Sequence, residues 1–239
     1  MLLALGGTFM LHGALVALGL RFDLTPGSTS LSLYLAGLAC PALAAIALAG
    51  KAGRKNLLCA LGAISGQGGT IAAALLAQPL MIVAANLLAR GEAMAFQPMP
   101  GMLLLALGQL IVVLGEEPGW RFYLLPRLNR KLGLRGGVLA MAAIWGIWHA
   151  PMFFVAGSLQ SGSSPLFFAA QIFGWSALHA ALYLRAQGSL VPHLVLHAGA
   201  NLALSLGLLV PGAENMLMAV SLVTGGVVVL ALPLFQSRV

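Results

Sequence analysis

Charged residues are scarce in this sequence. Its 239 residues include 12 Lys or Arg and 5 Asp or Glu, so that 7% of the chain is charged while 60% is hydrophobic. A soluble domain carries charge on about a quarter of its residues. The composition therefore excludes a soluble globular domain and indicates a protein that lies in a lipid bilayer. The formal net charge of +7 comes from short loops between apolar runs, where basic residues set membrane orientation, and nucleic acid is ruled out as a partner.

Cysteine is scarce as well. Cys40 and Cys59 are the two cysteines of the chain, and each lies within or beside an apolar run. No further Cys or His follows at close spacing. The sequence therefore excludes a disulfide framework and a zinc knuckle.

Long apolar runs fill most of the chain. A helix needs about 20 apolar residues to cross a hydrocarbon core of about 30 Å, and several runs reach this length. They predict a single all-α domain over residues 1–239, a polytopic integral membrane bundle of about eight transmembrane helices. The expected spans cover about residues 1–20, 31–50, 70–89, 102–119, 136–156, 165–184, 189–210 and 216–235.

Residues 56–69 do not fit this scheme. The segment carries four glycines together with Gln67. Such a composition suits a re-entrant or interfacial segment, or the tilted start of the third span. The sequence leaves these alternatives open.

Basic residues are distributed unevenly between the two sides of the predicted bundle. Nine lie in the loops after the second, fourth and sixth spans and at the C-terminus, and two lie in the opposite loops. Because cytoplasmic loops carry the excess of Lys and Arg, we expect both termini in the cytoplasm. The richness in Ala, Leu and Gly suggests a bacterial inner membrane. The nine are Lys51, Arg54, Lys55, Arg127, Arg130, Lys131, Arg135, Arg185 and Arg238, against Arg21 and Arg90.

A few ionisable residues fall inside the predicted spans. Such groups are costly in a bilayer, so each is a functional-site hypothesis by default. They are Glu116 and Glu117 at the end of the fourth span, His149 in the fifth, and His193 and His197 in the seventh, with Asn201 one helical turn after His197.

Three of these residues are expected at one depth. At about 1.5 Å per helical residue, Glu116, His149 and His197 lie roughly 16, 21 and 18 Å from their basic loops. We therefore predict one buried polar site, facing the bundle interior and nearer the cytoplasmic half.

The chemistry available at this site is narrow, since no Cys, Lys, Ser-His-Asp set or Gly-rich phosphate loop accompanies these residues. A carboxylate shielded from bulk water can act as a general base toward a bound water molecule. His197 and Asn201 share one helix face, so they could donate two hydrogen bonds to a developing oxyanion. The set predicts hydrolysis.

Three ordered motifs then give a family resemblance. The pattern E-E-x-x-x-R at Glu116, Glu117 and Arg121 is followed by aromatic-x-x-x-H and by H-x-x-x-N. Together they resemble the CPBP intramembrane proteases, the type II CAAX prenyl endopeptidases with their bacteriocin-processing and self-immunity relatives. The resemblance covers about residues 114–202, and the family often has Phe where this chain has an aromatic Trp. The second and third motifs are Trp145 with His149, and His197 with Asn201.

The resemblance implies a role for each motif residue. Glu116 and His149 would hold and activate the attacking water, and His197 and Asn201 would stabilise the oxyanion, in a catalytic core at about residues 102–210. Neighbours on a helix diverge by about 100°, so Glu117 should face away from Glu116. The supporting residues are Glu117, Arg121, Trp145 and His193. Glu117 is expected to form an i to i+4 ion pair with Arg121. His193 is either a group near the substrate or an interfacial histidine.

The residues of this site also form a possible metal-binding set. Glu116, His149 and His197 could bind Zn²⁺, since His₂Glu is a known catalytic zinc set. The H-E-x-x-H motif is absent and the oxyanion role removes one ligand, so we favour a metal-free mechanism. His12 and His179 match no motif and are expected to pack.

The leading interpretation is an intramembrane endopeptidase that hydrolyses a peptide bond of a membrane-anchored or hydrophobic substrate, with membrane lipid as its other partner. A proton-coupled transporter could use the same groups as a relay, although no internal repeat is visible. A non-catalytic immunity or peptide-binding membrane protein is the other alternative.

Overall fold

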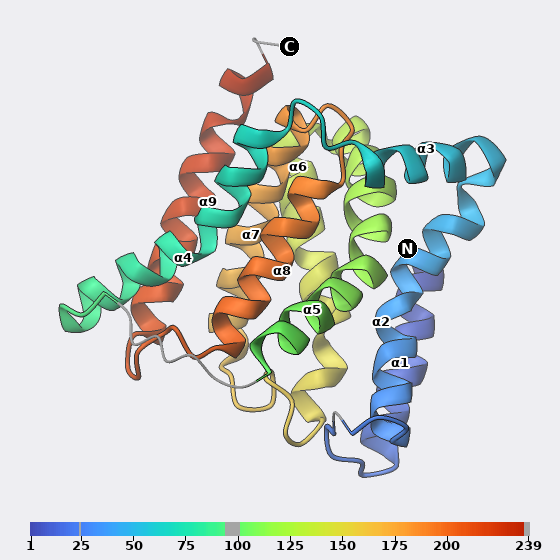
Figure 1. Cartoon of the computed structure of the whole chain (residues 1–239), viewed down its shortest axis with the longest axis vertical. Helices are drawn as coiled ribbons and strands as arrows, with labels where there is room; N and C mark the ends of the chain where they lie inside the picture. The colour runs from blue at the N-terminus through green and yellow to red at the C-terminus, as the bar shows by residue number, and fades with distance from the viewer. Residues whose placement is uncertain (24, 94–100, 237–239) are drawn as a thin grey trace.

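The computed structural model describes residues 1–23, 25–93 and 101–236. Within these ranges all regular structure is helical (Figure 1). Five helical stretches are long and apolar enough to cross a membrane. The chain is therefore an integral membrane protein with the all-α polytopic fold that the sequence predicts, while the number of eight spans stays a prediction. The five stretches are Thr29–Leu48, Gly68–Arg90, Met102–Phe154, Pro165–Arg185 and Glu214–Leu234.

Helices α1 (Leu2–Ala17) and α2 (Thr29–Leu48) pack against each other at one side of the bundle (Figure 1). With 16 residues, α1 is about 24 Å long and shorter than a full span. The two helices approach closely at Gly37, where a Cβ atom would overlap the ring of His12. Thr8 Oγ1 donates to the Gly37 carbonyl at 2.7 Å. His12 thus packs between helices, as expected.

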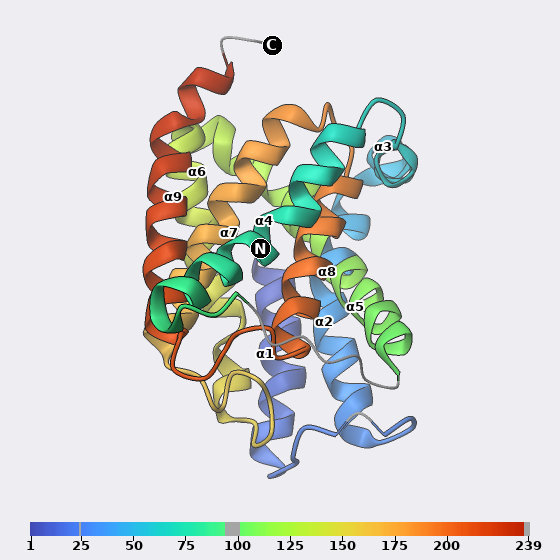
Figure 2. The same ribbon diagram turned by 60° about the vertical axis from the view of Figure 1, so that its left-hand side comes forward.

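Helix α3 (Gly50–Gly62) resolves the ambiguity of residues 56–69. It runs across the long axis of the molecule in Figure 1 and is seen almost end-on in Figure 2. Leu57 and Ala60 are buried, whereas the basic residues are exposed. The segment is therefore the end of a helix that lies across the bundle, followed by a turn. Its last two residues, 68 and 69, begin α4 (Gly68–Arg90).

Helix α5 (Met102–Glu117) continues into a π-helical turn, η1 (Pro118–Leu124), and then into α6 (Leu125–Trp148). Pro118 has no N–H for the i to i−4 ladder, which accounts for the change of helix type. The sequence predicted a loop over residues 120–135, but the helix continues through most of it. The chain bends at Gly133, whose φ of 69° and ψ of 170° lie outside the helical region and suit glycine.

Helices α7 (Pro165–Arg185), α8 (Val191–Ser205) and α9 (Glu214–Gln236) complete the bundle, after a short 3₁₀ turn η2 (Ala150–Phe154). A core rich in tryptophan side chains from η1, α6 and α7 packs against residues of α1, α2 and α8. The most deeply buried are Trp120, Trp145 and Trp148.

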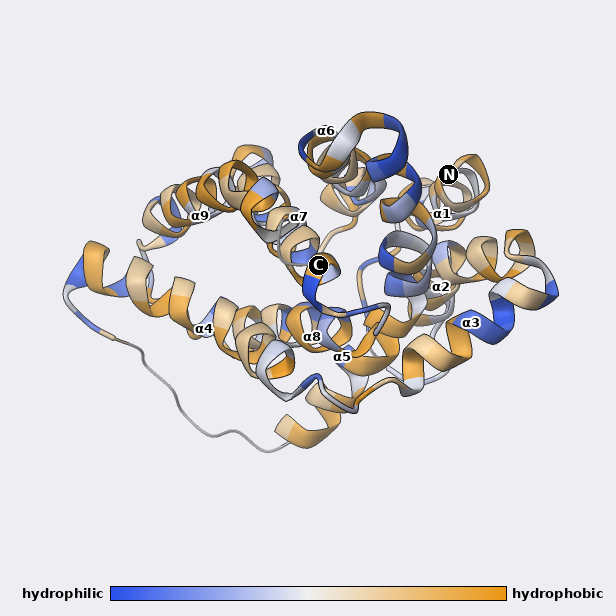
Figure 3. Ribbon diagram, turned by 90° about the horizontal axis from the view of Figure 1, so that it is seen from above, coloured by the Kyte–Doolittle hydropathy of each residue, from blue (hydrophilic) through white to orange (hydrophobic). Residues whose placement is uncertain are grey.

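The cations of α3, of the first turns of α6 and of the end of α7 lie toward one end of the bundle. Seen from above that end, hydrophilic residues gather on α3 and α6 (Figure 3). We call this the cationic end. Arg238 lies outside the described residues, and the assignment of this end to the cytoplasm stays a prediction.

Candidate active site

The two adjacent glutamates end α5, directly before the π-helical turn. Such turns are frequent at functional sites. Glu116 is 2% exposed and Glu117 is fully buried. Because neighbouring residues diverge around the helix, each carboxylate meets a different helix of the bundle.

Glu116 is held by indoles. Its Oε2 accepts hydrogen bonds from Trp145 Nε1 at 2.9 Å and from Trp120 Nε1 at 3.3 Å. Its Oε1 has no hydrogen-bond partner in the described part of the chain. The carboxylate is therefore fixed through one oxygen, while the other stays available to a water molecule.

Glu117 joins two charged or titratable partners. Its Oε2 lies 3.1 Å from Arg121 Nε, which is the predicted ion pair. Its Oε1 lies 2.9 Å from His197 Nδ1 on α8. The sequence assigned His197 to the face of Glu116, so this contact differs from the expectation. The reason is the position of α8, which packs on the Glu117 side of α5.

His149 caps the C-terminal end of α6. Its Nδ1 lies 2.8 Å from the carbonyl of Trp145. A carbonyl can only accept, so Nδ1 carries the proton and Nε2 of the neutral ring has the free lone pair. The ring packs edge-on against Trp148 and Phe168, with centroids 4.6 and 4.9 Å away. His149 is half-buried, which leaves its basic nitrogen room for a small molecule.

Asn201 lies one helical turn after His197 on α8, as the motif spacing predicts. Its side chain is half-buried. The amide makes no hydrogen bond with the described residues, so both its donors are available. His197 is 3% exposed and its Nδ1 faces a carboxylate, which leaves Nε2 as the free nitrogen.

Trp145 lies at the centre of the site. Its ring centroid is 5.1 Å from that of His197, 5.9 Å from His149 and 6.0 Å from His179. The guanidinium of Arg121 lies over the same ring at 4.3 Å. A Phe, frequent here in the family pattern, would offer the same ring face but no N–H for the glutamate.

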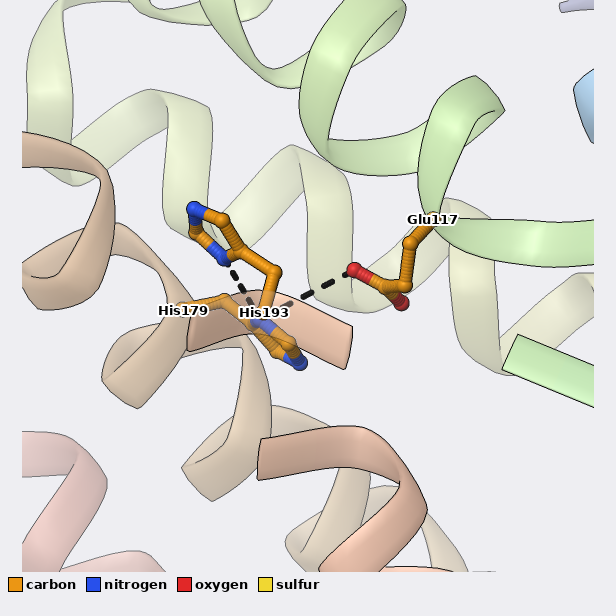
Figure 4. Close-up of side chains that lie close together, drawn as sticks. All are labelled: Glu117, His179 and His193. Carbon is orange, nitrogen blue, oxygen red and sulfur yellow. Dashed lines mark hydrogen bonds and ion pairs between the residues drawn. The ribbon is translucent and has the colours of Figure 1, made fainter. Parts of the chain in front are cut away.

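His179 and His193 form a second pair beside Glu117. Their Nδ1 atoms are 2.9 Å apart, and His179 Nδ1 lies 3.9 Å from Glu117 Oε2. Figure 4 shows the three side chains turned toward one another from α5, α7 and α8. Both histidines are buried. His193 thus lies beside Glu117 in the described structure, and its role at the site stays a prediction.

His179 is the residue that sequence reasoning missed. It lies in no motif and was expected to pack. The available signal was its position inside an apolar run, since buried ionisable groups in membranes are functional candidates.

The donor atoms that lie within 4.8 Å of one another belong to Glu117, His179 and His193. This His₂Glu set differs from the expected one of Glu116, His149 and His197, which is not brought together at this spacing within the described residues. A metal ion would have to share Glu117 Oε2 with a guanidinium. Since two cations on one buried oxygen repel each other, the arrangement fits a hydrogen-bond network better than a metal centre.

Residues 98–203 match the family described as type II CAAX prenyl endopeptidase Rce1-like. The matched segment includes all three motifs, from Glu116 to Asn201. No curated protein matches the chain.

Proposed function

Through residues 98–203 the chain belongs to the Rce1-like type II CAAX prenyl endopeptidases, and on this premise we propose that it hydrolyses a peptide bond by a glutamate-activated water inside the membrane. One observation carries the proposal. The adjacent glutamates divide their contacts, so that Glu116 binds Trp145 on α6 and Glu117 binds His197 on α8. The three motifs thereby meet at one buried place.

Water activation is assigned to Glu116 and His149. A water molecule would bind between the free Oε1 of Glu116 and the unprotonated Nε2 of His149. As its oxygen attacks the carbonyl carbon, one proton passes to this pair. The C–N bond then breaks, and the same proton goes to the leaving amine.

Oxyanion stabilisation is assigned to His197 and Asn201. The Nδ1–H of His197 donates to Glu117, so a second proton on Nε2 would make the ring a cationic donor held by a carboxylate. The amide of Asn201 supplies the other donor. Loss of one donor of this kind typically costs about 10² to 10³ in rate.

Glu117 is a positioning residue in this scheme. It fixes the ring of His197 through one oxygen and is itself fixed by Arg121 through the other. The substrate is proposed to be a membrane-anchored or hydrophobic peptide, and the protein to act in a bacterial inner membrane with both termini in the cytoplasm.

The proposal is tested with purified protein and a library of membrane-anchored peptides in H₂¹⁸O. Hydrolysis places one ¹⁸O in each new C-terminal carboxylate, which mass spectrometry detects together with the cleavage position. Glu116→Gln should abolish this signal. Glu214→Gln is the matched control, because it makes the same chemical change at an exposed position on α9. Labelled product from Glu116→Gln at the wild-type rate would refute the assignment.

A further inference from the structure

A hollow at the cationic end of the bundle lies away from the proposed catalytic residues. Its volume is about 530 Å³, within the range of small-molecule sites. It opens between the first turns of α6, the end of α7 and the end of α9. Residues that line it include Asn129, Arg130, Leu134, Arg135, Leu184 and Pro233.

The bend of α6 creates this hollow. Gly133 interrupts the helix, and a helical segment begins again at Leu134. The first residues of the new segment, Leu134 and Arg135, line the hollow. The positive end of that segment's dipole therefore adds to the arginine charge there.

Arg135 is fixed at the rim by α9. Its Nε donates to the Val229 carbonyl at 3.2 Å and its Nη2 to the Leu230 carbonyl at 3.1 Å. Pro233 has no N–H, so the Val229 carbonyl lacks its usual i+4 partner within the helix. The arginine satisfies this carbonyl and is held in place by it.

Other polar groups of the hollow are left without partners. Arg130 is exposed and makes no hydrogen bond, ion pair or ring contact with the described residues. Both polar atoms of the Asn129 amide are buried and unpaired there. Arg127 is different, since it donates to the Tyr123 carbonyl at 2.6 Å and lies over the Tyr123 ring. Arg130, which lines the hollow, is therefore free to meet an external anion, unlike Arg127.

No Asp or Glu is among the described residues that line the hollow. Of the five acids, two are the buried glutamates of the proposed active site. Asp23 and Glu92 lie in the connections that follow α1 and α4, and Glu214 begins α9.

We propose that this hollow binds the phosphate of an anionic phospholipid headgroup. Arg130, Arg135 and the helix dipole supply the positive charge, and the Asn129 amide supplies hydrogen bonds. Leu132, 54% exposed, and the lining Leu134 and Leu184 offer apolar surface to the glycerol and acyl part. Basic pockets between helices at a membrane surface take such headgroups, whereas a free phosphate would leave the apolar surface unused.

The test is native mass spectrometry of the full chain in detergent with phosphatidylglycerol or phosphatidylcholine added. We expect one phosphatidylglycerol to bind about tenfold more tightly than phosphatidylcholine. Arg130→Gln should weaken this binding about fivefold, since a basic residue near an anionic lipid contributes about that factor. Lys51→Gln, which removes an exposed charge of α3 at the same end, should leave the affinity within twofold.

Each other outcome overturns a defined part of the proposal. Equal weakening by both substitutions means diffuse surface charge and no site. Both lipids carry a phosphate, so equal binding of the two means no selectivity for a net anionic headgroup. A third arm adds inorganic phosphate alone, and displacement of the lipid by millimolar phosphate would mean an anion site without lipid recognition. None of these results bears on peptide hydrolysis, which is measured separately.

Discussion

The contrast between the two adjacent glutamates gives the sharpest test of the site. Glu117 and Arg121 form an ion pair whose side chains are both 0% exposed. The terminal nitrogens of Arg121 have no hydrogen-bond partner among the described residues. The arginine therefore depends on Glu117 and on the Trp145 ring for its stabilisation.

Glu117→Gln removes the charge of one partner and strands the other. Breaking a buried pair costs about 3 to 5 kcal/mol. The Gln oxygen can still accept from Arg121 Nε, so we expect a loss near the lower end, about 3 kcal/mol in the free energy of unfolding. Glu116→Gln breaks no ion pair and keeps an oxygen for both indoles. Its unfolding free energy should therefore change much less than that of Glu117→Gln.

A double-mutant cycle isolates the ion pair. Arg121→Met should also destabilise the protein, because it leaves Glu117 buried with less compensation. The double substitution of Glu117→Gln with Arg121→Met removes both charges, and its loss should be smaller than the sum by about 2 kcal/mol. Denaturant unfolding in detergent micelles, followed by tryptophan fluorescence, measures all three.

The two glutamates should also differ in how their substitution affects activity. Glu116→Gln should lower turnover by at least about 10² in a protein of wild-type stability. Glu117→Gln should lower turnover together with stability, because His197 loses its carboxylate. The ion-pair argument is refuted if the losses in unfolding free energy of the two single substitutions simply add in the double variant. It is also refuted if Glu117→Gln is as stable as the wild type. If Glu117→Gln is stable but inactive while Glu116→Gln is active, the roles of the two glutamates are reversed. If both variants keep wild-type turnover, the assignment as a glutamate-dependent protease is refuted.

Three further predictions concern the aromatic residue, metals and topology. Trp145→Phe keeps the ring but deletes the 2.9 Å bond to Glu116, so turnover should fall and stability should drop by about 1.5 to 3 kcal/mol; wild-type kinetics would show that the indole N–H is dispensable. Hydrolysis should survive exhaustive chelation, and a tightly bound zinc whose removal and return switch activity off and on would overturn the metal-free mechanism. In a cysteine-free background, Lys55→Cys should be labelled only by reagents that reach the cytoplasm and Ser164→Cys from outside, with the reverse pattern inverting the topology.

Much of the site was predictable because it is local in the chain. The Glu117 to Arg121 pair follows from the spacing of an α-helix, in which residues four apart are neighbours whatever surrounds them. The alignment of His197 with Asn201 has the same origin. Membrane residence follows from composition alone, since the chain has too few charged residues for a soluble surface.

The contacts between helices were decided by tertiary structure. Nothing in the sequence indicates that His197 would meet Glu117, that Trp145 would donate to Glu116, or that His179 would join the site. In a soluble protein the apolar stripe of a helix tells which face turns inward. In a bilayer the lipid-facing side is as apolar as the core, and many leucines here are exposed, so hydropathy does not fix how each helix is rotated.

The bend at Gly133 and the crosswise orientation of α3 were likewise decided by tertiary structure. A glycine permits a positive φ but does not require it, and the packing of α6 against α7 and α9 selects it. The sequence by itself thus determined the membrane environment, the motifs and the contacts within each helix, because these depend on covalent spacing. Tertiary structure alone decided which motif residues touch, because helix rotation depends on how side chains of different helices interlock.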